Sequence, residues 1–195
     1  MQILFYTKDS PQSFAEGLGT FPDAPKKCPH KNCHIPVKMR KHGFYKRYII
    51  NDSFTGVIRI RRYICPMCGR TVSMLPSFCL PYMQYGVTVV IFALWAAMEC
   101  NSVKYAGTRW SGRPQTLTRR HIYHYRNRII RNRGHIQFGL NIISPGFIEL
   151  KQITGDLDWT REFLKVVNDT NPPQFNVKYH SLTGTSFMSL HNTVA

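Results

Sequence analysis

The sequence predicts an α+β fold in which a small, metal-clamped β-hairpin precedes a three-helix unit and a short C-terminal α/β or irregular tail. Two close cysteine pairs enclose two runs of alternating aromatic, basic and β-branched residues. A continuous apolar segment follows, and then a basic amphipathic one. We expect four parts, an N-terminal arm, the hairpin region, the helical unit and the tail, over residues 1–25, 26–82, 83–135 and 136–195.

The chain has 195 residues and a formal charge of +16, and this excess lies in two blocks. Residues 26–70 contain twelve basic residues and one acid, a net charge of +11. Residues 101–148 contain nine basic residues and no acid. A solvated surface normally mixes both signs of charge, whereas a surface of one sign attracts a polyanion. Nucleic acid and anionic membrane are the two candidate partners.

The membrane alternative fails on segment length. The longest apolar run, Val87–Met98, has twelve residues, and a membrane-spanning helix needs roughly 20. Met1–Lys8 shows no basic region followed by an apolar core, so no secretory signal is visible. We therefore expect a cytoplasmic, nucleoid-associated protein in a reducing compartment, where clustered cysteines bind metal rather than form disulfides.

The two cysteine pairs predict a Zn²⁺ site. Cys28 and Cys33 have C-x4-C spacing, and Cys65 and Cys68 have C-x2-C spacing. Two such turns can supply four thiolates to one tetrahedral Zn²⁺. Gly69, directly after the second pair, suits a turn that requires a positive φ.

Other candidate ligands lie near the first pair. His30 or His34 could replace Cys33, although we favour the four cysteines. Cys79 and Cys100 have no partner at a ligand spacing, and we expect them to be buried thiols.

Between the cysteine pairs the sequence predicts a β-hairpin with strands over Phe44–Ile50 and Val57–Ile64. Turn-forming residues between the strands include Asn51, Asp52, Ser53 and Gly56. The period of two places Arg59 and Arg61 on one face and the neighbouring isoleucines on the other. The residues expected to contact nucleic acid here are Lys46, Arg47, Arg59, Arg61 and Arg62.

The cysteine spacing, the basic hairpin and the segment Tyr63–Thr71 together resemble the zinc ribbon at the N-terminus of many insertion-sequence transposases. In that family a helix-turn-helix follows the ribbon. The continuation over Ser73–Phe78 and Leu80–Tyr82 is similar to a bacterial family of small zinc-ribbon proteins of unknown function with the same layout. The resemblance covers roughly residues 28–133 and implies a DNA-binding protein of a mobile element.

Three helices are predicted after the hairpin. The first runs from about Gln84 to Glu99, is apolar on all sides, and is therefore expected at the centre of the core. Ser102 can cap a second helix that ends near Trp110, and residues 111–115 form a turn with Gly and Pro. Thr116 or Thr118 can cap a third helix over about residues 119–133, with Gly134 at its C-cap.

The third helix has two distinct faces, as a recognition helix requires. Ile122, Tyr125 and Ile129 share the face expected to meet the core. The opposite face carries Arg120, His124, Asn127 and Arg131, with Arg128 at its edge. Arg and Asn can make paired hydrogen bonds to guanine and adenine edges. Phosphate contacts are expected nearer the turn, from Arg109, Arg113 and Arg119.

The tail is near neutral. A short helix is expected over Trp159–Val167, ended by Pro172 and Pro173, and the rest is expected to be strand or loop. The tail could be an interaction segment or could pack against the helical unit, and packing is favoured. No arrangement of carboxylates for a two-metal phosphoryl-transfer site is visible, so we expect no catalytic domain and no enzyme activity.

The sequence therefore predicts sequence-specific binding of double-stranded DNA by an accessory or regulatory factor of a mobile element, with a transposase or other mobile-element protein as a further partner. Two alternatives stay open. In the first, the protein binds RNA and Tyr45 and Tyr48 stack on unpaired bases. In the second, the ribbon is a protein-interaction module that recruits a transposase or a polymerase.

Overall fold

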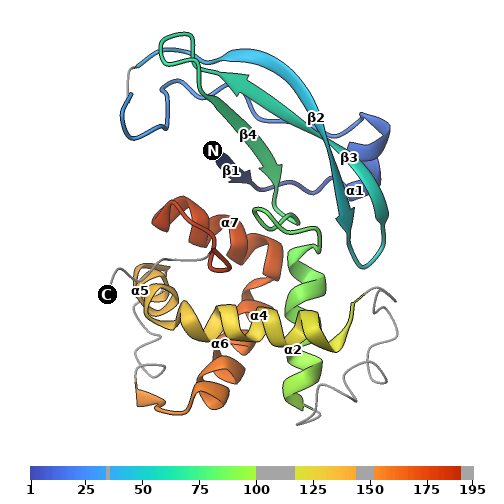
Figure 1. The fold of residues 1–195 in the computed structure, drawn as a ribbon, viewed down its shortest axis with the longest axis vertical. Helices are drawn as coiled ribbons and strands as arrows, with labels where there is room; N and C mark the ends of the chain where they lie inside the picture. Colours follow the sequence, from blue (N-terminus) through green and yellow to red (C-terminus); the bar gives the residue numbers. More distant parts are fainter. Residues whose placement is uncertain (34–35, 100–116, 144–151, 190–195) are drawn as a thin grey trace.

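The computed structural model describes residues 1–33, 36–99, 117–143 and 152–189. Over these residues the fold is α+β, as predicted, with a four-stranded sheet at one end and a group of helices at the other (Figure 1). Helix α7 lies between the sheet and the other helices of the group (Figure 1). Within these ranges, none of the helices combines the length and the apolar character needed to cross a bilayer.

The sheet contains the predicted hairpin and two further strands, in the order β1-β4-β3-β2. Its strands are β1 (Gln2–Phe5), β2 (Arg40–Ile50), β3 (Thr55–Ile64) and β4 (Thr71–Pro76). The hairpin of β2 and β3 is confirmed, although both strands begin earlier than predicted and Gly56 pairs with Ile49 inside the ladder rather than lying in the turn.

The first 25 residues are more than an arm. Strand β1 pairs in parallel with β4, so it completes the sheet from a position about 70 residues away in sequence. Helix α1 (Pro11–Glu16) follows, capped by the Ser10 side chain and ended by Gly17 in the left-handed conformation. The buried ring of Phe14 fixes this helix in the apolar cluster against β3.

Helix α2 (Val87–Glu99) is the central core helix, as its uniform apolar character predicts. It packs against three other helices of the described chain. It begins three residues later than predicted because the residues before it pair with the end of the hairpin. The Ile50 N–H donates to the Gln84 carbonyl at 2.8 Å, and the Gly86 N–H donates to the Ile50 carbonyl at 2.8 Å.

The predicted third helix is α4 (Arg119–Arg131), which begins after Thr118 as expected. Gly134 is not its C-cap, because the chain turns only at Asn132 and continues as helix α5 (Arg133–Ile143). The Asn132 side chain is buried and donates to the carbonyls of Phe187 and Ser189. This side chain marks the break between the helices, a role that only its distant partners reveal. The predicted helix over residues 102–110 and the turn over 111–115 lie outside the described residues.

The tail is more helical than predicted. The expected short helix is α6 (Asp156–Thr170), and its predicted apolar stripe is buried. Pro172 and Pro173 end it as expected, but they also begin helix α7 (Pro172–Thr183), where the sequence predicted strand or loop. Proline at the first helical position is favourable because its missing N–H would have no partner there. The tail packs against the helical unit, so the favoured alternative is the one observed.

The amide of Asn176 in α7 joins the helices to the segment that follows β4. Its Nδ2 donates to the carbonyls of Ser77 at 3.0 Å and Cys79 at 2.9 Å, and the residue is fully buried. An Asn176→Ala variant should therefore lose about 1–3 kcal/mol in free energy of unfolding, because two buried carbonyls lose their donor. Urea unfolding measures this loss.

Lys178→Ala, an exposed change in the same helix, is the matched control and should stay within about 0.5 kcal/mol of wild type. Equal stabilities of the two variants would contradict the role of the Asn176 amide.

Candidate metal centre and basic faces

Four cysteine sulfurs converge at the end of the sheet that carries the β3–β4 turn. The Sγ atoms of Cys28, Cys33, Cys65 and Cys68 all lie within 4.8 Å of one another. Cys28 Sγ is 3.7 Å from Cys68 Sγ, and Cys33 Sγ is 3.9 Å from Cys65 Sγ. A tetrahedral ion with metal–sulfur bonds of about 2.3 Å separates its ligands by about 3.8 Å. The four predicted ligands therefore have the spacing that a tetrahedral metal site requires.

Two tight turns present the sulfurs. In the first, the Cys33 N–H donates to the His30 carbonyl at 2.9 Å. In the second, the Gly69 N–H donates to the Cys65 carbonyl at 2.9 Å, and Gly69 has a φ of 68°. The positive φ expected of this glycine is confirmed, and a residue with a side chain would strain the turn.

The pKa values of two buried thiols, one from each turn, are shifted in opposite directions. Burial raises the pKa of Cys28 to about 12. The backbone N–H groups of Cys68 and Met67 lower the pKa of Cys65 to about 7, because they stabilise its thiolate. A bound cation would favour the thiolate at every ligand, so metal binding and proton release are linked here.

Of the two histidines considered as alternative ligands, only His30 lies within the described residues. His30 does not belong to the sulfur cluster, and its Nε2 lies 3.3 Å from the Thr71 carbonyl, which it can donate to. His34 lies outside the described residues, as does Cys100. Cys79 is fully buried, as expected, and burial raises its pKa to about 12. It is not a member of the cluster.

The sulfur cluster rests on a small apolar cluster formed with Met39, Tyr63, Val72 and Met74. This cluster holds only a few buried side chains, so its burial alone contributes little to stability. Cross-linking of the two turns by a metal ion would fix β2, β3 and β4 relative to one another.

The hairpin residues predicted to contact nucleic acid fall into two groups. Lys46 and Arg59 are exposed, and the Arg61 guanidinium lies over the Phe44 ring at 3.7 Å from its centroid. Arg47 instead points toward the loop before α2, where its Nη2 donates to the carbonyls of Leu80 and Met83. These hydrogen bonds give Arg47 a structural role.

Arg62 is partly buried, and its Nε has no hydrogen-bond partner in the described chain. It therefore presents less of its guanidinium to solvent than Arg59 does.

Helix α4 has the two faces that the sequence predicted. Ile122, Tyr125 and Ile129 are buried in the main core. The opposite face is exposed and carries all four of its predicted members, Arg120, His124, Asn127 and Arg131.

The flanks of this face are partly occupied by contacts within the protein. Arg128 Nη1 donates to the Met188 carbonyl at 2.8 Å. Arg119 Nη2 donates to the Tyr123 hydroxyl at 3.1 Å, a contact within α4. Arg119 nevertheless remains exposed to solvent. Arg109 and Arg113 lie outside the described residues.

A buried tyrosine, Tyr85, contacts both the hairpin and α4. Tyr85 forms a parallel bridge with Ile50 at the end of the hairpin. Its ring lies 5.3 Å from the His121 ring and 6.3 Å from the Tyr125 ring, both in α4. A Cβ at Gly86 would lie 2.3 Å from Asn51 Oδ1 and 3.2 Å from the Phe78 carbonyl oxygen, so a side chain there would force these neighbours to shift. The hairpin and α4 are thus fixed relative to each other.

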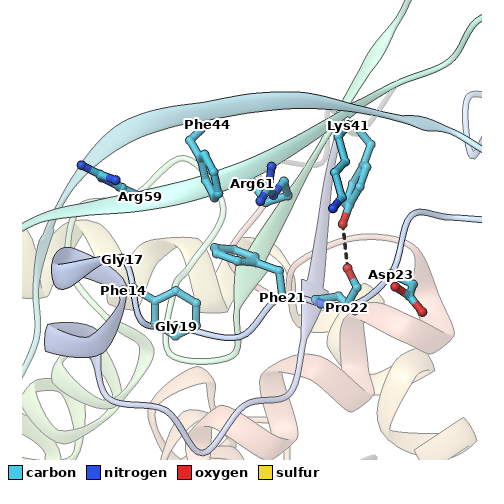
Figure 2. Close-up of a pocket in the computed structure, with 11 residues that line it drawn as sticks. Phe14, Gly17, Gly19, Phe21, Pro22, Asp23, Lys41, Phe44, Arg59 and Arg61 are labelled. Carbon is cyan, nitrogen blue, oxygen red and sulfur yellow. Dashed lines mark hydrogen bonds between the residues drawn. The ribbon is translucent and has the colours of Figure 1, made fainter.

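A pocket beside the hairpin, which the sequence pattern did not predict, combines aromatic and basic side chains, among them Phe21, Lys41 and Phe44 (Figure 2). Gly43 lies just before the predicted strand Phe44–Ile50, whereas the structure places it inside β2. An isolated glycine within a strand indicates a β-bulge, so the late predicted start of the strand hid this signal.

Comparison with known proteins gives one match. Residues 28–120 match a family described as a domain of unknown function (DUF6431), a range that includes all four clustered cysteines, the hairpin and α2. No curated protein and no solved structure matches the chain.

The purified chain should contain one metal ion per molecule by elemental analysis. Cys65→Ser should lose the metal, because it removes one of the four thiolates, and chelation should unfold the sheet as followed by circular dichroism. Cys79→Ala is the matched control, since it removes a buried thiol that lies outside the cluster. Full metal content in Cys65→Ser, or loss of metal in Cys79→Ala, would refute the assignment.

Proposed function

We propose that the chain is a zinc-ribbon protein that binds double-stranded DNA, with α4 as the recognition helix in the major groove and the hairpin on the phosphate backbone. The exposed face of α4 supports this proposal most strongly. It offers two arginines, an asparagine and a histidine along one side of a helix whose other side is anchored in the core.

Zinc fits the four-thiolate cluster best among common ions. Tetrahedral sites of four cysteine sulfurs hold Zn²⁺ or an iron–sulfur cluster, and the sulfur spacing here suits one ion. Four protein ligands leave no open position for water or substrate, so the ion has a structural role.

Within the described chain, no ion pair neutralises the positive charge of α4. The three ion pairs found there join Arg133 to Asp156, Arg161 to Asp158 and Lys165 to Glu162. None of them uses a residue of α4, and α4 contains no acid. A helix of this kind repels itself unless a polyanion neutralises it, which a DNA backbone does.

A helix-turn-helix is the arrangement that best relates α2 and α4. The two helices pack together, and the sequence between them contains the predicted second helix and its Gly–Pro turn. We propose that this unit presents α4 to the groove. The further proposal that the protein acts as an accessory or regulatory factor in transposition rests on the resemblance of residues 28–133 to transposase zinc ribbons.

The RNA alternative depended on two stacking tyrosines. Tyr48 is 48% exposed and is available for a base. Tyr45 is opposite Ile60 in the sheet, and its hydroxyl is buried. We therefore prefer double-stranded DNA to RNA as the ligand that α4 and the hairpin bind together.

Arg120→Ala and Asn127→Ala should lower affinity for a duplex selected from a random-sequence library by about five- to 150-fold, the loss of about 1–3 kcal/mol expected for a base contact. They should change affinity for unrelated duplexes much less. Fluorescence anisotropy measures both affinities, and Lys178→Ala controls for the loss of one charge outside α4 and the hairpin. Equal losses on selected and unrelated duplexes would show that α4 does not read bases.

Lys46→Ala should weaken binding to all duplexes alike and should reduce the slope of log affinity against log salt by about 1, because it removes one phosphate contact. Titrations at several salt concentrations give this slope. Duplex affinity that does not change with salt would exclude a polyanion interface for the wild-type chain.

A further inference from the structure

A pocket of about 290 Å³ lies between the segment after α1 and the hairpin (Figure 2). Its walls come from residues 14–23 on one side and from β2 and β3 on the other. The volume is close to the lower end of small-molecule sites, about 300–1,000 Å³. A pocket of this size holds one nucleotide-sized group and excludes a duplex.

Aromatic rings line the pocket. The ring centroids of Phe14 and Phe21 are 5.2 Å apart, and those of Phe21 and Phe44 are 5.8 Å apart. Phe44 is 42% exposed, and the Arg61 guanidinium covers part of its ring. Unpaired bases stack on surfaces of both kinds, the face of an aromatic ring and the plane of an arginine.

Three cationic side chains, from Lys41, Arg59 and Arg61, also line the pocket. They attract a phosphate, but Asp23 lies among the lining residues as well. A site for phosphate alone has no use for a carboxylate, whereas a base edge offers N–H groups that a carboxylate accepts. Aromatic, cationic and acidic groups together match a nucleoside phosphate.

A β-bulge places Lys41 and Phe44 on this face. Lys41 is opposite Tyr63, and Phe44 is opposite Arg61, so β2 has two residues between its partners where β3 has one. In a regular strand, residues three positions apart, such as Lys41 and Phe44, would point to opposite faces of the sheet. Gly43, with a φ of 70°, makes the bulge possible. Bulges are frequent next to binding sites because they redirect side chains in this way.

The back of the pocket is rigid. Tyr63 is buried, and its hydroxyl donates to the Pro22 carbonyl at 2.8 Å, which ties the segment after α1 to β3 (Figure 2). The Phe14 ring fills the space beside Gly19, where a Cβ would lie 2.4 Å from it. A preformed pocket loses little conformational entropy when a ligand binds.

We propose that this pocket binds one unpaired nucleotide, with the base stacked on the Phe21 and Phe44 side and the phosphate held by Lys41 and Arg61. The site goes beyond the proposed function, because duplex recognition by α4 does not require it. Its ligand is either a nucleotide within a single strand or a free nucleotide, and both have the same recognition chemistry.

The test uses the full zinc-loaded chain and a single-stranded decamer that contains 2-aminopurine, whose fluorescence falls on stacking. We expect binding with quenching, and a loss of affinity of about five- to 100-fold in Phe44→Ala. Phe44→Tyr keeps the ring and should restore both affinity and quenching. Phe138→Ala is the matched control, since it removes an exposed phenylalanine of α5 that does not line the pocket.

The role of positive charge is tested with the same decamer. Lys41→Ala should lower the affinity for the decamer more than Lys178→Ala does. Competition by AMP and GMP then separates the two sources. A decamer bound at least tenfold more tightly than either nucleotide supports the strand, and comparable affinities support the free nucleotide.

Three outcomes overturn the proposal. The first is equal losses in Phe44→Ala and Phe138→Ala in chains with full metal content. The second is competition by inorganic phosphate as strong as that by AMP. The third is failure of the decamer and of both nucleotides to bind. Duplex selection with Arg120→Ala is scored separately, so failure of the pocket and failure of α4 recognition remain distinguishable.

Discussion

The convergence of four cysteine sulfurs is the constraint on which the sheet depends. Cys28 and Cys33 come before the hairpin, and Cys65 and Cys68 come after it, so an ion shared by the four sulfurs would close the hairpin into a loop with fixed ends. The apolar cluster beneath the sulfurs is too small to do this alone. Fixed ends would in turn help to hold the bulge at Gly43 and the adjoining pocket in place. In this account a bound metal ion takes part in no reaction, and its role is to hold the two cysteine turns together.

Rigid coupling extends from the sheet to the helices. Tyr85 packs against α4 while its backbone bridges Ile50, and the Asn176 amide ties α7 to the segment after β4. The hairpin and α4 are therefore held by one framework. Positive charge that is held in place on a framework has a cost in self-repulsion, and a bound polyanion removes that cost. For this reason we propose that the exposed face of α4 binds nucleic acid, which would relieve the repulsion between its positive charges.

Local signals predicted much of this molecule, and long-range contacts account for what they missed. Cysteine spacing predicted the cluster, the period of two predicted the hairpin, and the 3.6-residue period predicted both faces of α4. Strand β1 was missed because its partner is about 70 residues away. Arg47 and Arg128 looked like surface charges, yet each donates to a distant backbone carbonyl. Helix α7 was missed because its first prolines were interpreted only as a stop signal.

Chemical-shift mapping of the ¹⁵N-labelled, zinc-loaded chain during titration with duplex DNA tests the central claim most directly. The account predicts that the largest shifts occur at the exposed positions of α4, with a second group along β2 and β3. It also predicts that amides of α6 on the side away from α4 stay unchanged. Shifts concentrated in α6 and α7, with α4 unaffected, would contradict the account.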